Sequence, residues 1–521
     1  MRTILTLLVI TVSIISAPAA RAFDRCDKLF ATPDELKTFL LEEGVQSAPV
    51  KYFAQAKSIR IETEGAGRLL PFAKIDSRGN QIIVYPAIFP PVLCRLALTA
   101  YLAIGTNSDL LTEPARDAGR CIAANRPRET CITDYANDLE RRYRATFAKE
   151  KEDERNTAYS IVSDAIGQIA KHEFAHRLLK HQERVQSGEI ARIDAEFEAD
   201  YYAVLNGAQT GEVPSAMYYF FKPLEEMEDN APEMRSADYE SASCRATNIN
   251  DVTGVFSLTP LVLLDAIEGG GRFTNTPSDY IRTVAQQLAK EDAPKPSADT
   301  CGRLAPVVLR ESHGELKRLT AMVAEYADLL PVSPENKDKR FGEGLRDPAI
   351  FKLVARLQRA SQELTHLKGL AARALSLLIH RVEIGGVESD MARELDDILQ
   401  SSEAEYLSGD YGRILNVRAV SILYDKASEP ITAARMNRAE PLFRKSVDFL
   451  PNASEAWMNL AFIAFARGDC AKAAEMADES AHTGAQRERS EAEYFRDAMR
   501  KLSTPESCAN EAARSSPLGR P

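Results

Sequence analysis

The chain has 521 residues and a formal net charge of −11 at neutral pH. This length is too great for one ordinary hydrophobic core, so two or three domains are expected. The acidic balance argues against a nucleic-acid partner, because proteins that bind nucleic acids carry basic surfaces.

The first 22 residues have the pattern of a signal peptide. Arg2 precedes an apolar core from Ile4 to Ile15, and a small-residue ending at Ala22 precedes Phe23. We expect cleavage near Ala22 and export of the remaining chain to the periplasm or outside the cell. The alternative is an uncleaved membrane anchor, which the short apolar core disfavours because a spanning helix needs about 20 apolar residues.

A second apolar segment runs from Ala87 to Gly105. It contains Pro90, Pro91 and Arg95, which favour a buried core helix over a membrane-spanning one. No later segment predicts a transmembrane helix, so we expect no stable membrane span after cleavage of the signal peptide.

Eight cysteines remain after the predicted cleavage, and none belongs to a C-x-x-C pair. An even number of cysteines in an exported chain predicts disulfide bonds rather than cysteine-bound zinc. Proximity in the sequence predicts two pairs, Cys121 with Cys131 and Cys470 with Cys508. The pairing of the other four is left open.

Residues 165–182, AIGQIAKHEFAHRLLKHQ, place two histidines four residues apart with a glutamate directly after the first. Apolar residues from Val162 to Ile169 lead into His172 and His176 at helical spacing, so both imidazoles share one helix face. Two nitrogens one turn apart can bind one metal ion, with Glu173 beside it. The alternative is a pair of buried, hydrogen-bonded histidines. Because a catalytic zinc needs three protein ligands and a water, a third ligand must lie elsewhere.

A second amphipathic helix is predicted in residues 191–205, ARIDAEFEADYYAVL. Glu196 and Asp200 lie one turn apart near its apolar face, although a solvated acidic face is the alternative. A polar turn containing Gly188, a predicted helix stop, would send this helix back past the histidines. We predict Glu196 as the third ligand and Asp200 as the acceptor of a hydrogen bond from a ligand histidine. Glu198 points to another side and is the weaker candidate.

The motif H-E-x-x-H followed by E-x-x-x-D resembles the gluzincin metallopeptidases, and HEFAHRLLKH with EFEADYYA is most similar to the HtpX and Oma class, peptidase family forty-eight. The resemblance implies one zinc ion per chain, bound by His172, His176 and Glu196. It implies Glu173 as the general base and Asp200 as a support for a ligand histidine. The implied activity is hydrolysis of protein or peptide substrates by a zinc-bound water.

Further features bear on this resemblance. Residues 75–93, IDSRGNQIIVYPAIFPPVL, resemble the hairpin, strand and helix that precede the active site in that class, and His181 stands where the class often has another histidine. The chain departs from the class downstream, because Thr276 stands where a histidine is usual. Tyr280 and Arg282 are the nearest candidates for stabilising the transition state, and the alternative is that they belong to a solvent-facing helix start.

The last third of the sequence has helical patterns and an internal repeat. Residues 332–348 are polar and predict a linker, and residues 349–505 predict helices before a flexible tail at 506–521. Within residues 454–481, small residues follow tetratricopeptide spacing and Gly468 marks a turn between two antiparallel helices. The alternative is a generic helical bundle.

The sequence therefore predicts a mainly α fold, with a zincin-like metallopeptidase domain and a small β-hairpin or sheet at residues 23–331, then a tetratricopeptide-like (TPR-like) helical solenoid. The predicted function is an exported zinc endopeptidase whose repeats recruit a protein substrate or partner complex, with a role in envelope protein quality control. One alternative is a weak or inactive peptidase fold that acts as a TPR binding scaffold. Another is a zinc hydrolase of a non-peptide bond.

Overall fold

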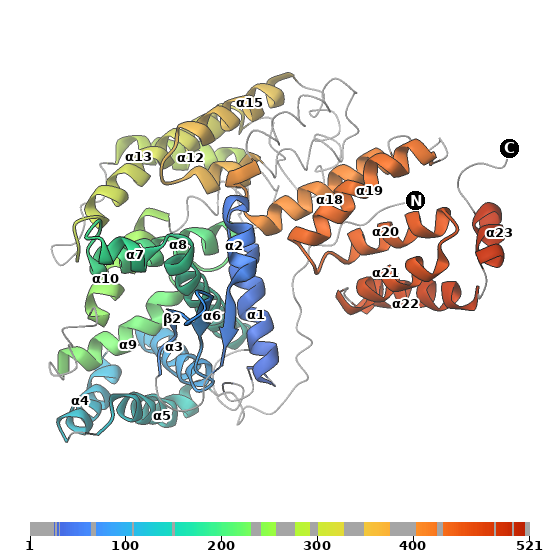
Figure 1. Cartoon of the computed structure of the whole chain (residues 1–521). Helices are drawn as coiled ribbons and strands as arrows, with labels where there is room; N and C mark the ends of the chain where they lie inside the picture. Colours follow the sequence, from blue (N-terminus) through green and yellow to red (C-terminus); the bar gives the residue numbers. More distant parts are fainter. Residues whose placement is uncertain are drawn as a thin grey trace.

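The computed structural model describes residues 26, 29–30, 32–63, 69–106, 109–124, 126–147, 152–230, 241–256, 277–291, 301–327, 348–375, 403–424, 431–483, 486–502 and 505–515. Helices dominate these residues, and a small sheet lies near the N-terminus (Figure 1). The predicted mainly α fold with a small sheet is therefore confirmed. The predicted signal peptide and nearly all of the predicted linker lie outside the described residues.

The sheet follows a short helical segment that comprises α1 (Pro33–Gln46), η3 (Val50–Tyr52) and α2 (Phe53–Ser58). Its strands are β1 (Arg60–Glu62), β2 (Phe72–Ile75) and β3 (Gln81–Val84), in the order β1-β3-β2. β3 is antiparallel to β2, as the predicted hairpin requires, and parallel to β1. β2 therefore lies at an edge of the sheet.

The turn between β2 and β3 has a clear sequence basis. A carboxylate oxygen of Asp76 accepts the backbone N–H groups of Arg78 and Asn80, each at 2.8 Å. Gly79 has a φ of 81°, a left-handed conformation that glycine adopts without steric cost. These local interactions fix the register of the hairpin.

Ten helices follow the sheet in the described residues up to 324, and one of them, α6, carries the two histidines of the motif. They are α3 (Phe89–Thr106), α4 (Asp109–Ala123), α5 (Arg128–Phe147), α6 (Glu152–Leu178), α7 (His181–Gln186), α8 (Arg192–Thr210), α9 (Ala216–Asn230), α10 (Ala242–Phe256), α12 (Pro277–Lys290) and α13 (Ala305–Ala324). α6 packs against α1, α3, α8 and α9. α3 is the buried helix predicted from the second apolar segment, and none of the described helices is long and apolar enough to cross a membrane.

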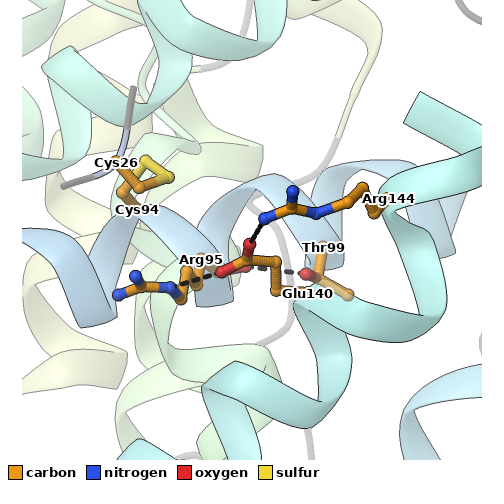
Figure 2. Close-up of a disulfide and its surroundings, with 6 residues drawn as sticks. All are labelled: Cys26, Cys94, Arg95, Thr99, Glu140 and Arg144. Atoms are coloured by element: carbon orange, nitrogen blue, oxygen red, sulfur yellow. Dashed lines mark hydrogen bonds and ion pairs between the residues drawn. A yellow bond between two sulfur atoms is a disulfide. The ribbon is translucent and has the colours of Figure 1, made fainter. Parts of the chain in front are cut away.

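Figure 2 shows how α3 is anchored on both sides. Cys26 forms a disulfide with Cys94 and so ties the N-terminal segment to this helix. Next to it, Arg95 donates to Glu140 of α5 at 2.6 Å, and the same carboxylate accepts from Arg144. The covalent bond and the shared carboxylate together hold α3 against its neighbours.

All eight cysteines are paired. The bonds join Cys26 to Cys94, Cys121 to Cys131, Cys244 to Cys301, and Cys470 to Cys508. Both pairs predicted from the sequence are confirmed. Four disulfides indicate an extracytoplasmic protein, because the cytosol keeps most thiols reduced.

The C-terminal helices pack largely in chain order (Figure 1). They are α15 (Pro348–Glu363), η6 (Glu403–Glu405), α18 (Ser408–Tyr424), α19 (Ala433–Phe449), α20 (Ser454–Ala466), α21 (Cys470–Thr483), α22 (Gln486–Lys501) and α23 (Pro505–Ser515). Gly468, with a φ of 79°, makes the predicted turn between α20 and α21.

Two large hydrophobic cores and a smaller cluster around Ile83 and Phe174 lie within the described chain. The first extends from Cys26 through α15 to Leu415 of α18, and includes Phe449. The second begins at Ala419, also in α18, and continues to Ala512. Side chains on both sides of the predicted linker thus share the first core, and α18 contributes to both cores.

Candidate metal centre

The structure brings the three predicted ligands together between α6 and α8. The Nε2 atom of His172 lies 3.0 Å from Nε2 of His176 and 3.3 Å from Oε2 of Glu196. The third side of this triangle, from Nε2 of His176 to Oε2 of Glu196, measures 3.6 Å. Zinc–ligand bonds of about 2.0–2.1 Å in a tetrahedron place ligand atoms roughly 3.3–3.4 Å apart. The triangle therefore has the size that a zinc ion requires.

The donor chemistry also fits zinc. Two imidazoles and one carboxylate leave a fourth tetrahedral position open, which is the arrangement of catalytic rather than structural zinc sites. Within the described residues, His172, His176 and Glu196 form the single group of this kind. His172 is buried and the other two are partly exposed, so the site opens on one side.

A cavity of about 400 Å³ lies against these ligands. Glu173 lines it and is 7% exposed, next in sequence to His172. Phe72 and Ala73 of the edge strand β2 form part of the wall. Aromatic and aliphatic side chains form much of the remainder, among them Phe89, Phe220, Phe221 and Leu224. The cavity thus combines an apolar surface with a few convergent polar groups, as ligand sites do.

Asp200 and Arg245 support His172 on the side of its Nδ1 atom. Nδ1 of His172 lies 2.7 Å from a carboxylate oxygen of Asp200, as the sequence predicted. Arg245 of α10 donates to both oxygens of Asp200, at 2.6 and 3.1 Å, and its guanidinium lies over the ring of Phe221. The carboxylate is 1% exposed, and these contacts lower its pKa although burial opposes them. Asp200 is therefore ionised and fixes the orientation of the His172 ring.

The site favours a positive charge at His172. Burial and the nearby Arg245 lower the pKa of this imidazole, but Asp200 and Glu196 outweigh them and raise it to about 9. Burial raises the pKa of Glu196, yet His176 and His172 bring it well below its usual range. A metal ion that binds here would replace a proton on His172 and supply the charge that the carboxylates favour.

His176 has a different support, through His181. The Nδ1 atoms of the two rings lie 2.8 Å apart, and Nε2 of His181 lies 3.0 Å from Oε2 of Glu198. Arg184 donates to both oxygens of Glu198, at 2.6 and 3.1 Å. These contacts lower the pKa of Glu198 to about 2 against the effect of burial, while burial lowers the pKa of His181. Glu198 therefore pairs with His181 and Arg184 and lies outside the triangle of His172, His176 and Glu196.

The connection between α6 and α8 differs from the predicted turn. α6 ends at Leu178, and Lys180 adopts a left-handed φ of 54° without being a glycine. The short helix α7 follows and places His181 and Arg184 beside α8. Gly188, with a φ of 75°, lies just after α7 and so stops this extra helix rather than α6.

Sequence reasoning missed Arg245, because no local motif marks it. Its position depends on the packing of α10 against α8 and on the disulfide of its neighbour Cys244. Tyr280 and Arg282, the candidates from sequence, are not among the described residues that line the cavity. Arg245 lines it and is the cation nearest the ligands in the described part of the chain.

Comparisons with known proteins gave no match: no protein-family model, curated protein or solved structure matches this chain. The candidate metal centre therefore rests on the arrangement of its own side chains.

Proposed function

We propose that this chain is an exported zinc endopeptidase that cleaves exposed segments of proteins. The proposal is carried by one observation: a triangle of two imidazoles and a carboxylate, with the dimensions of a zinc site, opens onto a cavity lined by Glu173. A buried pair of structural histidines would need neither the third donor nor the cavity.

A zinc ion at this site would act as a Lewis acid, activating a water molecule and polarising a substrate carbonyl. The Glu173 carboxylate would then accept the proton of the attacking water and pass it to the leaving amine. His172 and His176 hold their ligand orientation through Asp200 and His181. The neighbouring Arg245, whose Nη1 lies 3.8 Å from Glu196, would balance the negative charge of the ligand carboxylate.

The edge strand β2 supports a peptide as the substrate. Phe72 and Ala73 of this strand lie in the wall of the cavity that the ligands face. An extended peptide could lie along this wall and pass the ligands while its side chains contact the apolar residues of the cavity. This arrangement favours peptide hydrolysis over hydrolysis of a small non-peptide ester.

We further propose that the TPR-like helices from α18 onward bind the protein substrate or a partner complex at the cell envelope. Successive helices that pack in chain order, with a tight glycine turn between α20 and α21, are typical of such repeats. The predicted signal peptide and the four disulfides support a periplasmic or secreted location.

The decisive experiment compares the wild-type protein with Glu173→Gln on casein and on a quenched peptide library. Glutamine preserves the shape of the side chain but accepts no proton, so we expect retained zinc and a loss of turnover of at least about 100-fold. Glu183→Gln in α7, an exposed position that does not line the cavity, is the matched control and should keep full activity.

Cleavage by Glu173→Gln at the wild-type rate would contradict the proposed base. A zinc-loaded wild-type protein that cleaves neither casein nor any library peptide would instead favour the scaffold alternative.

A further inference from the structure

We propose that His181 is a positioning residue for the metal ligand His176, and that the Glu198–Arg184 ion pair selects the tautomer of both rings. The inference rests on the proposed zinc site. It explains what orients the second histidine, His176.

The direction of the hydrogen bonds follows from counting protons. Two nitrogens 2.8 Å apart must share one proton, because two lone pairs or two N–H groups at this distance repel. A histidine that binds a metal through Nε2 is neutral and carries its proton on Nδ1. His176 must therefore donate through Nδ1, and Nδ1 of His181 must accept.

Glu198 enforces this direction. With Nδ1 of His181 accepting, its proton lies on Nε2, which faces the Glu198 carboxylate at 3.0 Å and can donate to it. In the reverse arrangement, Nε2 of His181 would present a lone pair to a carboxylate, and Nε2 of His176 would carry a proton in place of the metal. The carboxylate therefore favours the metal-binding tautomer of His176.

The surroundings hold each member of this series in place. His181 is 2% exposed and its ring meets that of His176 edge-on, at an interplanar angle of 80°. Arg184 donates hydrogen bonds to both oxygens of Glu198, and this bidentate contact orients the carboxylate toward His181. The two ligand histidines are thus supported unequally, His172 directly by a carboxylate and His176 through a neutral imidazole.

The test measures the zinc dissociation constant of full-length variants by competition with a chromophoric chelator, without any substrate. His181→Phe keeps the ring but removes the acceptor, so zinc binding should weaken by about 10–100-fold. His181→Asn places an oxygen near the former Nδ1 position and should recover most of the affinity. Glu198→Leu, which keeps His181 but removes the selecting carboxylate, should weaken zinc binding by several-fold.

His366→Phe is the matched control, because His366 also pairs with a carboxylate, Glu311 at 2.8 Å, but lies outside the cavity lining. It should bind zinc as the wild type does. Circular dichroism of the metal-free proteins checks that each variant folds.

Wild-type affinity in both His181→Phe and Glu198→Leu would overturn the inference. So would equal losses in His181→Phe and His181→Asn, which would indicate a packing role. Because no substrate is present, these results are independent of peptidase activity: a zinc-binding protein without activity would contradict the proposed function alone.

Discussion

Asp200 shows how much the candidate site depends on single contacts. Its carboxylate is 1% exposed. It forms an ion pair with the guanidinium of Arg245 and contacts the imidazole of His172. A buried ionised carboxylate is costly unless its partners remain, because the interior does not solvate it as water does.

Replacing Arg245 with methionine should therefore affect both stability and zinc binding. We expect a loss of about 3–5 kcal/mol in the free energy of unfolding, since Asp200 would remain buried without its strongest partner. Zinc affinity should also fall because His172 loses its fixed support. Urea titration and zinc competition measure the two effects. Arg282→Met on α12 is the control, because this side chain is partly exposed and does not line the cavity. An equally small effect of both substitutions would contradict the role given to Arg245.

At the scale of elements, a disulfide connects α10 to a segment that contacts the start of α8. Cys244 precedes Arg245, and its partner Cys301 lies just before Arg303 and Leu304, whose N–H groups donate to Asp194 in the first turn of α8. The bond thus links the guanidinium that supports Asp200 to the helix that carries Glu196 and Asp200.

Replacing Cys244 and Cys301 with serine should weaken zinc binding as well as stability. Replacing Cys470 and Cys508 should lower the stability of the second core but leave zinc affinity unchanged, because that bond joins α21 to α23. Each pair should cost roughly 2–5 kcal/mol of unfolding free energy. Thermal unfolding and zinc competition on both double variants provide the comparison, and equal zinc affinities would refute the link between the first disulfide and the metal centre.

A buried charge cluster joins α1, α6 and the end of α8. Lys171 is fully buried and lies 2.7 Å from Glu43 of α1, and it also contacts Glu212. One ammonium group thus faces two carboxyl groups, and the Glu212 side chain is the more buried of the two. Burial raises its pKa to about 7, with Lys171 opposing and Glu43 adding to the shift.

This raised pKa predicts a pH dependence of stability. Between about pH 4.5 and pH 7 the folded state retains a proton on Glu212 that the unfolded chain releases, so the free energy of unfolding decreases as pH rises. Glu212→Gln removes this proton exchange. From about pH 5 to pH 8 the free energy of unfolding of the wild type should fall relative to that of the variant. The fall should be about 1.4 kcal/mol for each unit by which the pKa of Glu212 is higher in the folded than in the unfolded state. Parallel stability curves from urea titrations would show that Glu212 is ionised throughout.

At the scale of the whole molecule, the candidate ligands and the last helices belong to different hydrophobic cores. The ligands lie on α6 and α8, whose apolar residues contribute to the first core, whereas α20 to α23 contribute to the second. A chain that ends after Leu450 keeps α18 and α19, which contribute Tyr411 and Phe449 to the first core.

This truncation tests the proposed role of the repeats. Short-peptide cleavage should remain near the wild-type rate, while cleavage of a protein substrate bound by the repeats should fall by at least about tenfold, since tethering raises local concentration. Kinetics on a peptide and on casein measure both, after circular dichroism confirms folding. Loss of peptide cleavage in a folded truncated chain would instead make the repeats part of the catalytic unit.

The sequence predicts the parts of this molecule that depend on local spacing. His172, His176 and Glu173 follow from the period of one helix, whereas the hairpin is expected from the resemblance of residues 75–93 to a class of metallopeptidases. Arg245 could not be predicted, because the packing of α10 and the disulfide of Cys244 bring it to the site. The sequence does not determine which cysteine pairs with Cys244. The contact of His181 with Glu198 depends on α7, which begins after a left-handed lysine that no sequence rule indicates.

We propose that this chain binds one zinc ion through His172, His176 and Glu196. The most direct measurement is the zinc content per chain, by elemental analysis after equilibration with excess zinc and gel filtration. We predict one zinc ion in the wild type, far less than one in Glu196→Ala, and one in Glu198→Ala, because Glu198 faces His181 rather than the ligand triangle. A wild type without bound zinc, or the reverse order of the two variants, would contradict the account.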